Sequence, residues 1–227
     1  MLGVITGLMD EADLLSAPVH GVRVRCAGIG PVRARETALA LVAEGCRGLV
    51  SFGIAGGLDP ALAPGTVVLA ERVVDGDGGA WDTDAPWRGH LAALAGNGVT
   101  LAGGTLTGSR RVVATPAAKQ ELGRRNGAVA VDMESGGVAQ VAAEAGLPFL
   151  VVRAISDPAW TSVPRAAMKG VTPDGRRRPL GVVAALARRP GDLPGLLRLR
   201  RDSATALAAL GRVAAVSGGV LAFDHVP

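Results

Sequence analysis

Residues 127–158 read GAVAVDMESGGVAQVAAEAGLPFLVVRAISDP. Two short apolar runs, 128–131 and 149–152, flank a segment at 134–145 in which small apolar residues recur with helical spacing. Runs that are apolar on both faces are typical of parallel strands covered by helices on both sides. This part of the chain therefore predicts a strand, a helix and a second strand within an α/β fold.

Acidic residues follow both of these strands. Asp132 and Glu134 come after the first strand, and Asp157 comes after the second, preceded by Arg153 and Ser156. In open α/β sheets, ligands bind beyond the carboxyl ends of the strands. The three acids are therefore predicted to lie at a functional site, although an Asp or Glu in such a place can also cap a turn or a helix.

Length and composition favour a single α/β domain. The chain has 227 residues, 48% hydrophobic and 3% aromatic, so one sizeable core would be built mainly from Ala, Val and Leu. The 24 basic and 20 acidic residues give a net charge of +4. This mild excess lacks the aromatic residues that alternate with basic ones in nucleic-acid grooves, so no nucleic-acid partner is expected.

Cysteine use and hydropathy predict a cytoplasmic protein. Cys26 and Cys46 lack the short paired spacing of a metal site or a disulfide framework, so no metal is expected. The first apolar run has no basic segment before it, and no run reaches the roughly 18–20 apolar residues that span a bilayer. We therefore expect neither a signal peptide nor a transmembrane helix.

Two glycine-rich segments are further candidates for ligand contact. AGIG at 27–30 follows an expected strand, and GIAGGLDP at 53–60 follows the buried run 48–52. Glycine lets backbone N–H groups come close to a ligand, but a tight turn can require glycine for steric reasons alone. The second segment is predicted to be a loop and not a dinucleotide site, because another strand follows it where that site needs a helix.

Two longer segments are predicted to be loops. Residues 71–97 contain four Asp residues whose spacing does not fit a calcium loop, so we expect a solvated loop over the site. Residues 159–179 mix Pro, Gly and basic residues without periodicity, which is typical of a loop that closes over a substrate.

The last part of the chain is predicted to be a basic helical extension at about 180–215. We expect helices at 180–187 and 193–213, the second capped by Asp192. Arginines cluster at 188–201 beside several leucines. The segment is interpreted either as a surface helix that packs one face on the sheet or as a basic amphipathic patch that rests on an anionic membrane.

Several motifs, taken in order, resemble a known enzyme superfamily. VDMESGGVAQVA at 131–142 is followed by VVRAISD at 151–157, and AGIG at 27–30 and GIAGGLDPALAPGTVV at 53–68 precede them. The set resembles the purine and uridine phosphorylase superfamily, in its methylthioadenosine/adenosylhomocysteine nucleosidase branch, over roughly the first 160 residues. GLMDEA at 7–12, FGIAGGLDPALAPG and the tail RRPGDLPGLLRLRRDSATALAAL are most similar to the hopanoid-associated phosphorylases.

The resemblance implies one nucleoside phosphorylase-like domain over residues 1–227, with a three-layer fold, a central mixed β-sheet flanked by helices, and a homodimer. It implies an enzyme that releases adenine from a 5′-substituted adenosine, with adenosylhopane, a substrate of hopanoid biosynthesis, as the first choice. A methylthioadenosine/adenosylhomocysteine nucleosidase, a general purine nucleoside phosphorylase and a non-catalytic nucleotide-binding module on the same fold are the alternatives.

Cleavage of a purine N-glycosidic bond needs a proton for the leaving base, stabilisation of a cationic sugar and a nucleophile. By resemblance, Asp157 donates the proton and is oriented by Ser156, while Glu11 positions a nucleophilic water. Glu134 would bind the ribose hydroxyls. The other substrate contacts that the resemblance implies are Met133 beneath the sugar, Asp132, Ala55, Gly56, Val112 and Arg153.

The attacking group is left open between water and inorganic phosphate, and no metal or organic cofactor is expected. Glu11 favours water, although it lies one residue nearer to Gly7 than the matching glutamate of the nucleosidases does. Ile54 stands where relatives often carry a small hydroxyl residue that contacts the nucleophile. The candidate anion contacts are Arg33, Arg110, Arg111 and Arg153. A lipid-linked substrate would bring the protein to the inner face of the membrane.

Overall fold

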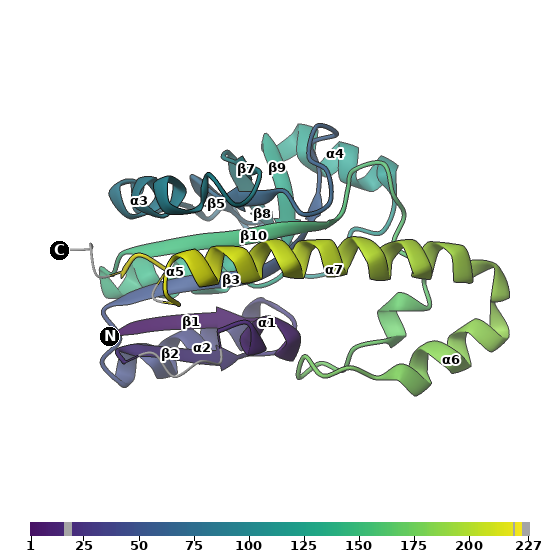
Figure 1. The fold of residues 1–227 in the computed structure, drawn as a ribbon, viewed down its shortest axis with the longest axis horizontal. Coiled ribbons are helices and arrows are strands. Elements are labelled where there is room, and N and C mark those ends of the chain that lie inside the picture. Colours follow the sequence, from purple (N-terminus) through teal and green to yellow (C-terminus); the bar gives the residue numbers. More distant parts are fainter. Residues whose placement is uncertain (16–19, 220, 224–227) are drawn as a thin grey trace.

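In the part of the chain that the structure describes, a ten-stranded mixed sheet forms the middle layer and helices cover both of its faces (Figure 1). The computed structural model describes residues 1–15, 20–219 and 221–223. Its strands are β1 Leu2–Thr6, β2 Val22–Cys26, β3 Gly48–Gly57, β4 Val67–Leu69, β5 Arg72–Val74, β6 Ala80–Asp82, β7 Leu101–Ala102, β8 Thr105–Gly108, β9 Ala128–Asp132 and β10 Phe149–Asp157. Its helices are α1 Met9–Asp13, α2 Pro31–Ala43, α3 Ala85–Ala95, α4 Pro116–Asn126, α5 Ser135–Ala145, α6 Pro179–Arg188 and α7 Leu193–Val216. The predicted α/β class with a central mixed sheet is confirmed.

Strand β3 lies at the centre of the sheet and has three partners. It pairs in parallel with β1 and β10, and antiparallel with β9. Gly56 of β3 is in register with Asp157 of β10 and also with Val131 of β9. Because β9 crosses the end of β3 in the opposite direction, both acid-bearing strands end near the same place.

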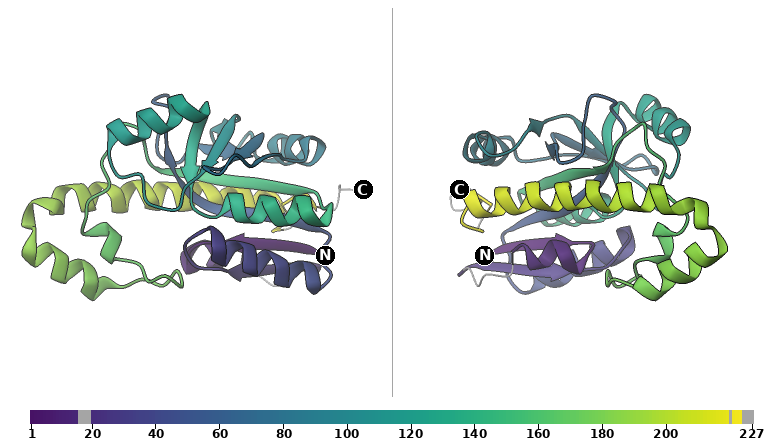
Figure 2. Two further views of the ribbon diagram at one scale, coloured as in Figure 1. Left: turned by 180° about the vertical axis from the view of Figure 1, so that it is seen from behind. Right: turned by 45° about the vertical axis from the view of Figure 1, so that its right-hand side comes forward.

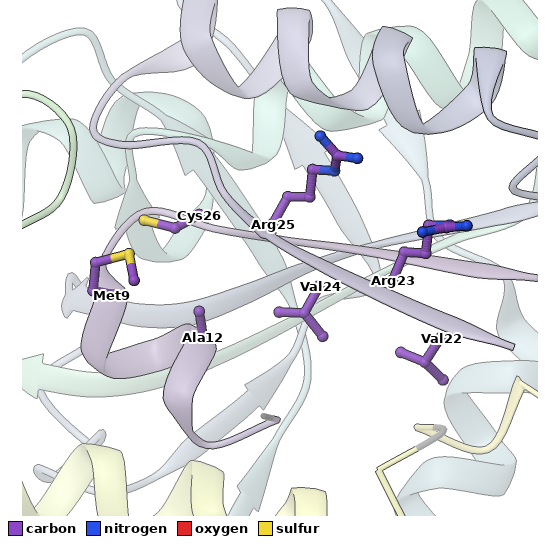
Figure 3. A pocket seen from close by; sticks show the side chains of 7 residues that line it. All are labelled: Met9, Ala12, Val22, Arg23, Val24, Arg25 and Cys26. Atoms are coloured by element: carbon purple, nitrogen blue, oxygen red, sulfur yellow. The ribbon is translucent and has the colours of Figure 1, made fainter. Parts of the chain in front are cut away.

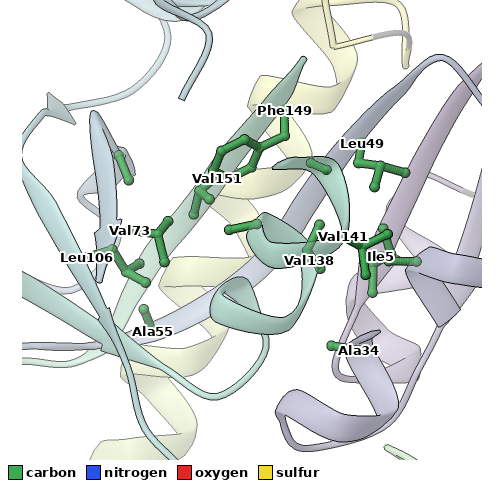
Figure 4. Packing of buried hydrophobic residues seen from close by; sticks show 14 of the residues in the cluster. Ile5, Ala34, Leu49, Ala55, Val73, Leu106, Val138, Val141, Phe149 and Val151 are labelled. Atoms are coloured by element: carbon green, nitrogen blue, oxygen red, sulfur yellow. The ribbon is translucent and has the colours of Figure 1, made fainter. Parts of the chain in front are cut away.

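Alternate residues of the central strands pack on opposite faces of the sheet. Val50 and Val152 belong to the core beneath α3 and α7, whereas Leu49 and Val151 belong to the core beneath α2 and α5 (Figure 4). Successive side chains of a strand point to opposite faces, so an uninterrupted apolar run supplies both cores. Figure 2 shows α7 along one face of the sheet and α2 with α5 on the other.

The strand, helix and strand predicted for 128–152 are present as β9, α5 and β10. Helix α5 ends at Gly146, whose left-handed φ of 63° suits glycine and stops the helix. Strand β10 continues to Asp157, well past the predicted end at 152, because its last residues pair with Ala55 and Gly56 of β3. The candidate acid Asp157 therefore belongs to the strand itself.

Two of the loop predictions are wrong. Residues 53–57 are not a loop but the second half of β3, which pairs there with β10 and β9. Residues 71–97 contain β5, β6 and α3. The N-cap of α3 is Asp84, which accepts a hydrogen bond of 2.8 Å from the Trp87 backbone N–H, and Trp87 itself is buried in the core.

The two helices near the carboxyl terminus are confirmed, and they form an arm that projects from the body of the protein (Figure 1). The second half of α7 packs on the sheet through small and branched residues such as Ala209 and Val213. Asp192 is the N-cap residue of α7, as predicted, but its side chain makes no capping hydrogen bond and its carboxylate accepts from Ala166 N at 3.1 Å instead. Among the described residues, no helix is long and apolar enough to cross a membrane.

The segment predicted to close over a substrate, 159–179, folds back against the amino-terminal part of the chain. It contains a 3-10 turn at Ala167–Lys169 and a bridge between Val171 and Arg177. Pro173 and Gly175 accept backbone hydrogen bonds from Ile29 and Met9, at 2.9 and 3.1 Å. These contacts attach the base of the arm to the AGIG turn and to the start of α1. Closure over a substrate stays a prediction.

Candidate active site

Three carboxylates and one guanidinium form a buried cluster where β3, β9 and β10 meet. Arg153 Nη2 lies 2.7 Å from Asp132 Oδ2, and Arg153 Nη1 lies 3.4 Å from Glu134 Oε2. The same guanidinium donates to Ser51 Oγ at 2.6 Å and to the Ile54 carbonyl at 3.2 Å. Arg153 and the nearby Glu11 are each 1% exposed. Charges this deeply buried are tolerated when they are paired and hydrogen-bonded. Arg153 meets this condition through Nη1 and Nη2, whereas its buried Nε has no hydrogen-bond partner among the described residues.

The carboxylate of Glu11 ties helix α1 to strand β3. Its Oε2 accepts from the backbone N–H groups of Gly7 and Leu8 at 2.9 Å, so it satisfies donors at the start of its own short helix. Its Oε1 accepts from Ile54 N at 2.8 Å. A Cβ atom on Gly53 would lie 2.5 Å from that Oε1 and 2.7 Å from Arg153 Nη1. Glycine at this position is therefore required by the close approach of the two charged groups.

Burial raises the pKa of two acids in the cluster. Desolvation raises the pKa of Glu11, while the charge of Arg153 and the three backbone donors lower it in part. Desolvation also raises the pKa of Glu134, to about 7. The positive charge of Arg153 lowers this pKa in part, whereas the negative charges of Asp132 and Glu11 raise it further. A carboxylate whose pKa lies near the working pH can accept or donate a proton during a reaction.

The predicted proton donor Asp157 lies next to Gly56 at the end of β10. Its Oδ1 accepts from the Ser156 hydroxyl at 2.8 Å, so the predicted orienting role of Ser156 has a geometric basis. Its Oδ2 lies 2.7 Å from Lys119 Nζ, on α4. Lys119 has no local signal in the sequence, because a lysine in the first turns of a polar helix is usually a solvent-facing residue.

Glu134 connects the charged cluster to the wall of a cavity. Its Oε1 accepts from Gly30 N, in the AGIG turn, at 3.1 Å. Gly30 and Met133 line a cavity of about 810 Å³ that reaches between α2, α4 and α5. Pockets of roughly 300–1,000 Å³ are typical of small-molecule sites, so this cavity has room for a nucleoside. Met133 lies in the wall of this cavity, and its contact with a sugar stays a prediction.

A second cavity, of about 620 Å³, lies between α1 and the edge strand β2 (Figure 3). It is lined by Met9, Ala12 and the side chains of β2. Its lining includes none of the predicted site residues, whereas Met133, Arg33 and Arg110 line the cavity of about 810 Å³. The candidate site is therefore placed at that cavity, although Glu11, Glu134 and Asp157 are not among the residues that line it.

The other predicted substrate contacts differ in how accessible they are. Ala55 is buried in β3 and its carbonyl accepts from Ser156 Oγ at 3.3 Å. The carboxylate of Asp132 is occupied by Arg153 and by the backbone and hydroxyl of Ser135. Val112 is 47% exposed, between β8 and α4.

The four candidate anion contacts also separate. Arg33 and Arg110 line the larger cavity, and Arg110 pairs with Asp77 at 2.5 Å. Arg111 is exposed. Arg153 is buried behind the carboxylates, so it reaches a ligand only through Asp132 and Glu134.

A mixed α/β sheet with buried acids at its strand ends, beside a cavity of nucleoside size, is the arrangement of an enzyme that acts on a small molecule. The family model described as "Phosphorylase superfamily" matches residues 14–188, and the chain belongs to this family. It is an enzyme of the kind that cleaves N-glycosidic bonds.

Two curated relatives illustrate the similarity. The 5′-methylthioadenosine/S-adenosylhomocysteine nucleosidase of Mycobacterium bovis is 32% identical over 190 residues, which cover 66% of this chain and 73% of the relative. The futalosine hydrolase of Streptomyces coelicolor is 36% identical over 177 residues, which cover 66% of this chain and 69% of the relative.

Solved structures share the fold at lower sequence identity. The 5′-methylthioadenosine/S-adenosylhomocysteine nucleosidase from Neisseria meningitidis, in complex with methylthio-immucillin-A, superposes with a TM-score of 0.71 at 19% identity, over 95% of this chain and 96% of that one. The S-adenosylhomocysteine nucleosidase from Streptococcus pyogenes has the same TM-score at 20% identity, over 100% of this chain and 97% of that one.

Proposed function

We propose that the protein hydrolyses the N-glycosidic bond of a 5′-substituted adenosine and releases adenine. The observation that carries the proposal is the convergence of Glu11, Glu134 and Asp157 around the end of β3, beside a cavity lined by Met133. In this proposal Asp157 protonates the leaving purine and Glu134 holds the ribose hydroxyls. The names of the relatives, which act on methylthioadenosine, adenosylhomocysteine and futalosine, support a nucleoside substrate.

The charge of the cluster favours water over phosphate as the attacking group. Three carboxylates surround a single guanidinium, so the site carries a net negative charge when its acids are ionised. Such a site stabilises the positive charge that develops on the sugar, and it repels an inorganic phosphate anion. Burial raises the pKa of Glu11, which makes this carboxylate a stronger base for a proton taken from water.

Product analysis tests the nucleophile. Methylthioadenosine is incubated with the protein in buffers that contain and lack phosphate, and adenine and the sugar product are separated by chromatography. Hydrolysis predicts the same rate in both buffers and a free sugar. A sugar 1-phosphate, or a reaction that depends on added phosphate, would show that phosphate attacks.

We propose that the 5′ substituent of the substrate is large and apolar, and that the substrate is adenosylhopane. The composition of the arm is the observation that supports this proposal. Residues 165–201 hold ten of the 24 basic residues of the chain and two of the 20 acidic ones. Large hydrophobic side chains are exposed on the same segment, namely Leu180, Val183, Leu193 and Leu197. A surface that is both basic and apolar is suited to a membrane with anionic lipids, and the base of the arm contacts the AGIG turn of the site wall.

Two assays test the lipid-linked substrate. The first compares turnover of adenosylhopane in detergent with turnover of methylthioadenosine. A strong preference for methylthioadenosine would favour the second candidate, a methylthioadenosine/adenosylhomocysteine nucleosidase, which the similarity to the Mycobacterium bovis enzyme supports.

The second assay is flotation with vesicles of phosphatidylglycerol and phosphatidylcholine. The double variant V183E/L197E should lose binding to the vesicles, whereas L94E, on the exposed side of α3, should bind like the wild type. Absence of wild-type flotation would remove the membrane from the proposal. A cytoplasmic homodimer that contacts the membrane peripherally is part of the same proposal, and light scattering after size-exclusion chromatography measures the mass of the assembly.

A further inference from the structure

Lys119 is a fully buried lysine on α4 that the proposed mechanism does not use. Its Nζ lies 2.7 Å from Asp157 Oδ2, and it donates to the carbonyls of Asp157, Pro158 and Thr161 at 2.8, 3.0 and 3.3 Å. An ammonium group removed from water is strongly unfavourable unless it is paired and hydrogen-bonded. Four oxygen atoms around a group with three N–H bonds satisfy that condition for Lys119.

Fastening α4 to the chain after β10 would need only the three carbonyl contacts. The fourth contact places the positive charge on a carboxylate oxygen of the proposed proton donor. The other oxygen of Asp157 accepts from Ser156. Both oxygens of this carboxylate are therefore held in place, one by a neutral hydroxyl and one by an ammonium group.

We propose that Lys119 is a positioning residue for Asp157, and that its charge stabilises the carboxylate left when Asp157 gives its proton to the purine. The inference rests on the proposed function. In this step the Asp157 O–H bond breaks and a purine N–H bond forms, while the electron pair of the glycosidic C–N bond passes to the purine. Water supplies the new bond to the sugar and its proton goes to Glu11. Lys119 keeps its own proton throughout.

The negative charge that appears on Asp157 lies 2.7 Å from an ammonium group inside the protein, where solvent screens it weakly. Lys119 comes from α4, and the next charged group along β10 is Arg153, which is paired with Asp132 and Glu134. Asp157 is thus the carboxylate with which the charge of Lys119 interacts. Removal of the Lys119 charge should slow reactions in which the leaving group needs a proton.

The test compares two leaving groups on the same sugar. Wild type, K119Q, K119M and D157N are assayed with 5′-methylthioadenosine and with the 4-nitrophenyl riboside that carries the same 5′-methylthio group. Nitrophenolate leaves without a proton, whereas adenine needs one. Gln keeps N–H donors for the carbonyls but has no charge, and Met keeps the length of the chain if the Gln variant does not fold. Circular dichroism and thermal melting establish which variants are folded.

For K119Q, the ratio of kcat for adenine release to kcat for nitrophenolate release should fall about 10–100-fold, with KM for the adenosine changed little. The fall in D157N should be larger, because a general acid contributes about 10²–10⁴-fold. The double variant D157N/K119Q should lose little beyond D157N, since residues that act through one another are not additive.

An unchanged ratio in folded K119Q, or equal losses on both leaving groups, would overturn the role of Lys119. Normal adenine release by D157N would instead overturn the proposed role of Asp157, so the two failures are distinguishable.

Discussion

The strongest prediction concerns the pH dependence of stability, and the perturbation is Glu134→Gln. The folded protein raises the pKa of Glu134 from 4.5 to about 7, chiefly because burial disfavours its charged form. The folded state therefore binds this proton more tightly than the unfolded state. By linkage, the contribution of Glu134 to the free energy of unfolding is most favourable below pH 4.5 and is lost as the pH rises towards 7. One pKa unit corresponds to about 1.4 kcal/mol, so the wild type should lose on the order of 3 kcal/mol through this group.

The measurement is urea unfolding of wild type and E134Q at a series of pH values from 5 to 8. Wild type should become less stable as the pH rises, and the slope should be markedly smaller in E134Q, because glutamine does not titrate. Burial also raises the pKa of Glu11, so a weaker slope of the same sign should persist in the variant. The exposed acid Glu121, paired with Arg124 on the surface, provides a matched control in E121Q. Equal slopes in wild type and E134Q would refute the reasoning.

Three further predictions concern the residues around β3. D157N should lower adenine release by about 10²–10⁴-fold while the protein stays folded, as measured by chromatography and circular dichroism; full activity would remove Asp157 from the mechanism. R153M should lower the free energy of unfolding by about 3–5 kcal/mol at neutral pH, because it leaves buried carboxylates without their counter-charge, and a loss below 1 kcal/mol in urea unfolding would contradict this. G53A should lose most activity, since its methyl group would displace Glu11 or Arg153, whereas G89A, at an open position on α3, should behave like the wild type in the same assay.

The central part of the fold and its acids could be predicted from the sequence because the signals are local. The apolar run at 149–152 supplies both cores of the sheet, whereas in the run at 128–131 Ala130 joins the core beneath α2 and α5, and Ala128 and Val131 pack with Leu58. Such apolar runs are typical of buried strands. Asp132 and Glu134 lie within three residues of the first run, and Asp157 ends the strand that begins with the second run. Their positions are therefore fixed once the two strands are placed next to β3.

The wrong predictions have local causes too. Helix α3 differs from the predicted loop because a run of Asp and Gly residues is typical of loops, although Asp84 followed by Pro86 is a signal for a helix start. Glycine is common in turns, so the sequence at 53–57 favours a loop, whereas in the structure Gly53 makes room within a strand for Glu11 and Arg153.

Lys119 could not have been found from local pattern. Its partners Asp157, Pro158 and Thr161 lie about forty residues further along the chain, and the contact exists only when α4 packs against the end of β10. The hydrogen bond of Asp192 could not be predicted from local sequence either, since its carboxylate accepts from Ala166 and not from the first turn of the helix that it precedes.

Because β3 pairs with three strands, catalytic activity requires that several distant segments of the chain are folded together. Glu11 comes from the first helix, Glu134 from the middle of the chain and Asp157 from the end of β10, and they come together only where β3 meets its three neighbours. A fragment that lacks any one of these segments would retain binding surfaces but no complete reaction centre. Turnover during dilution out of urea should therefore recover in step with the last tertiary contact to form, so catalysis can be used to follow refolding.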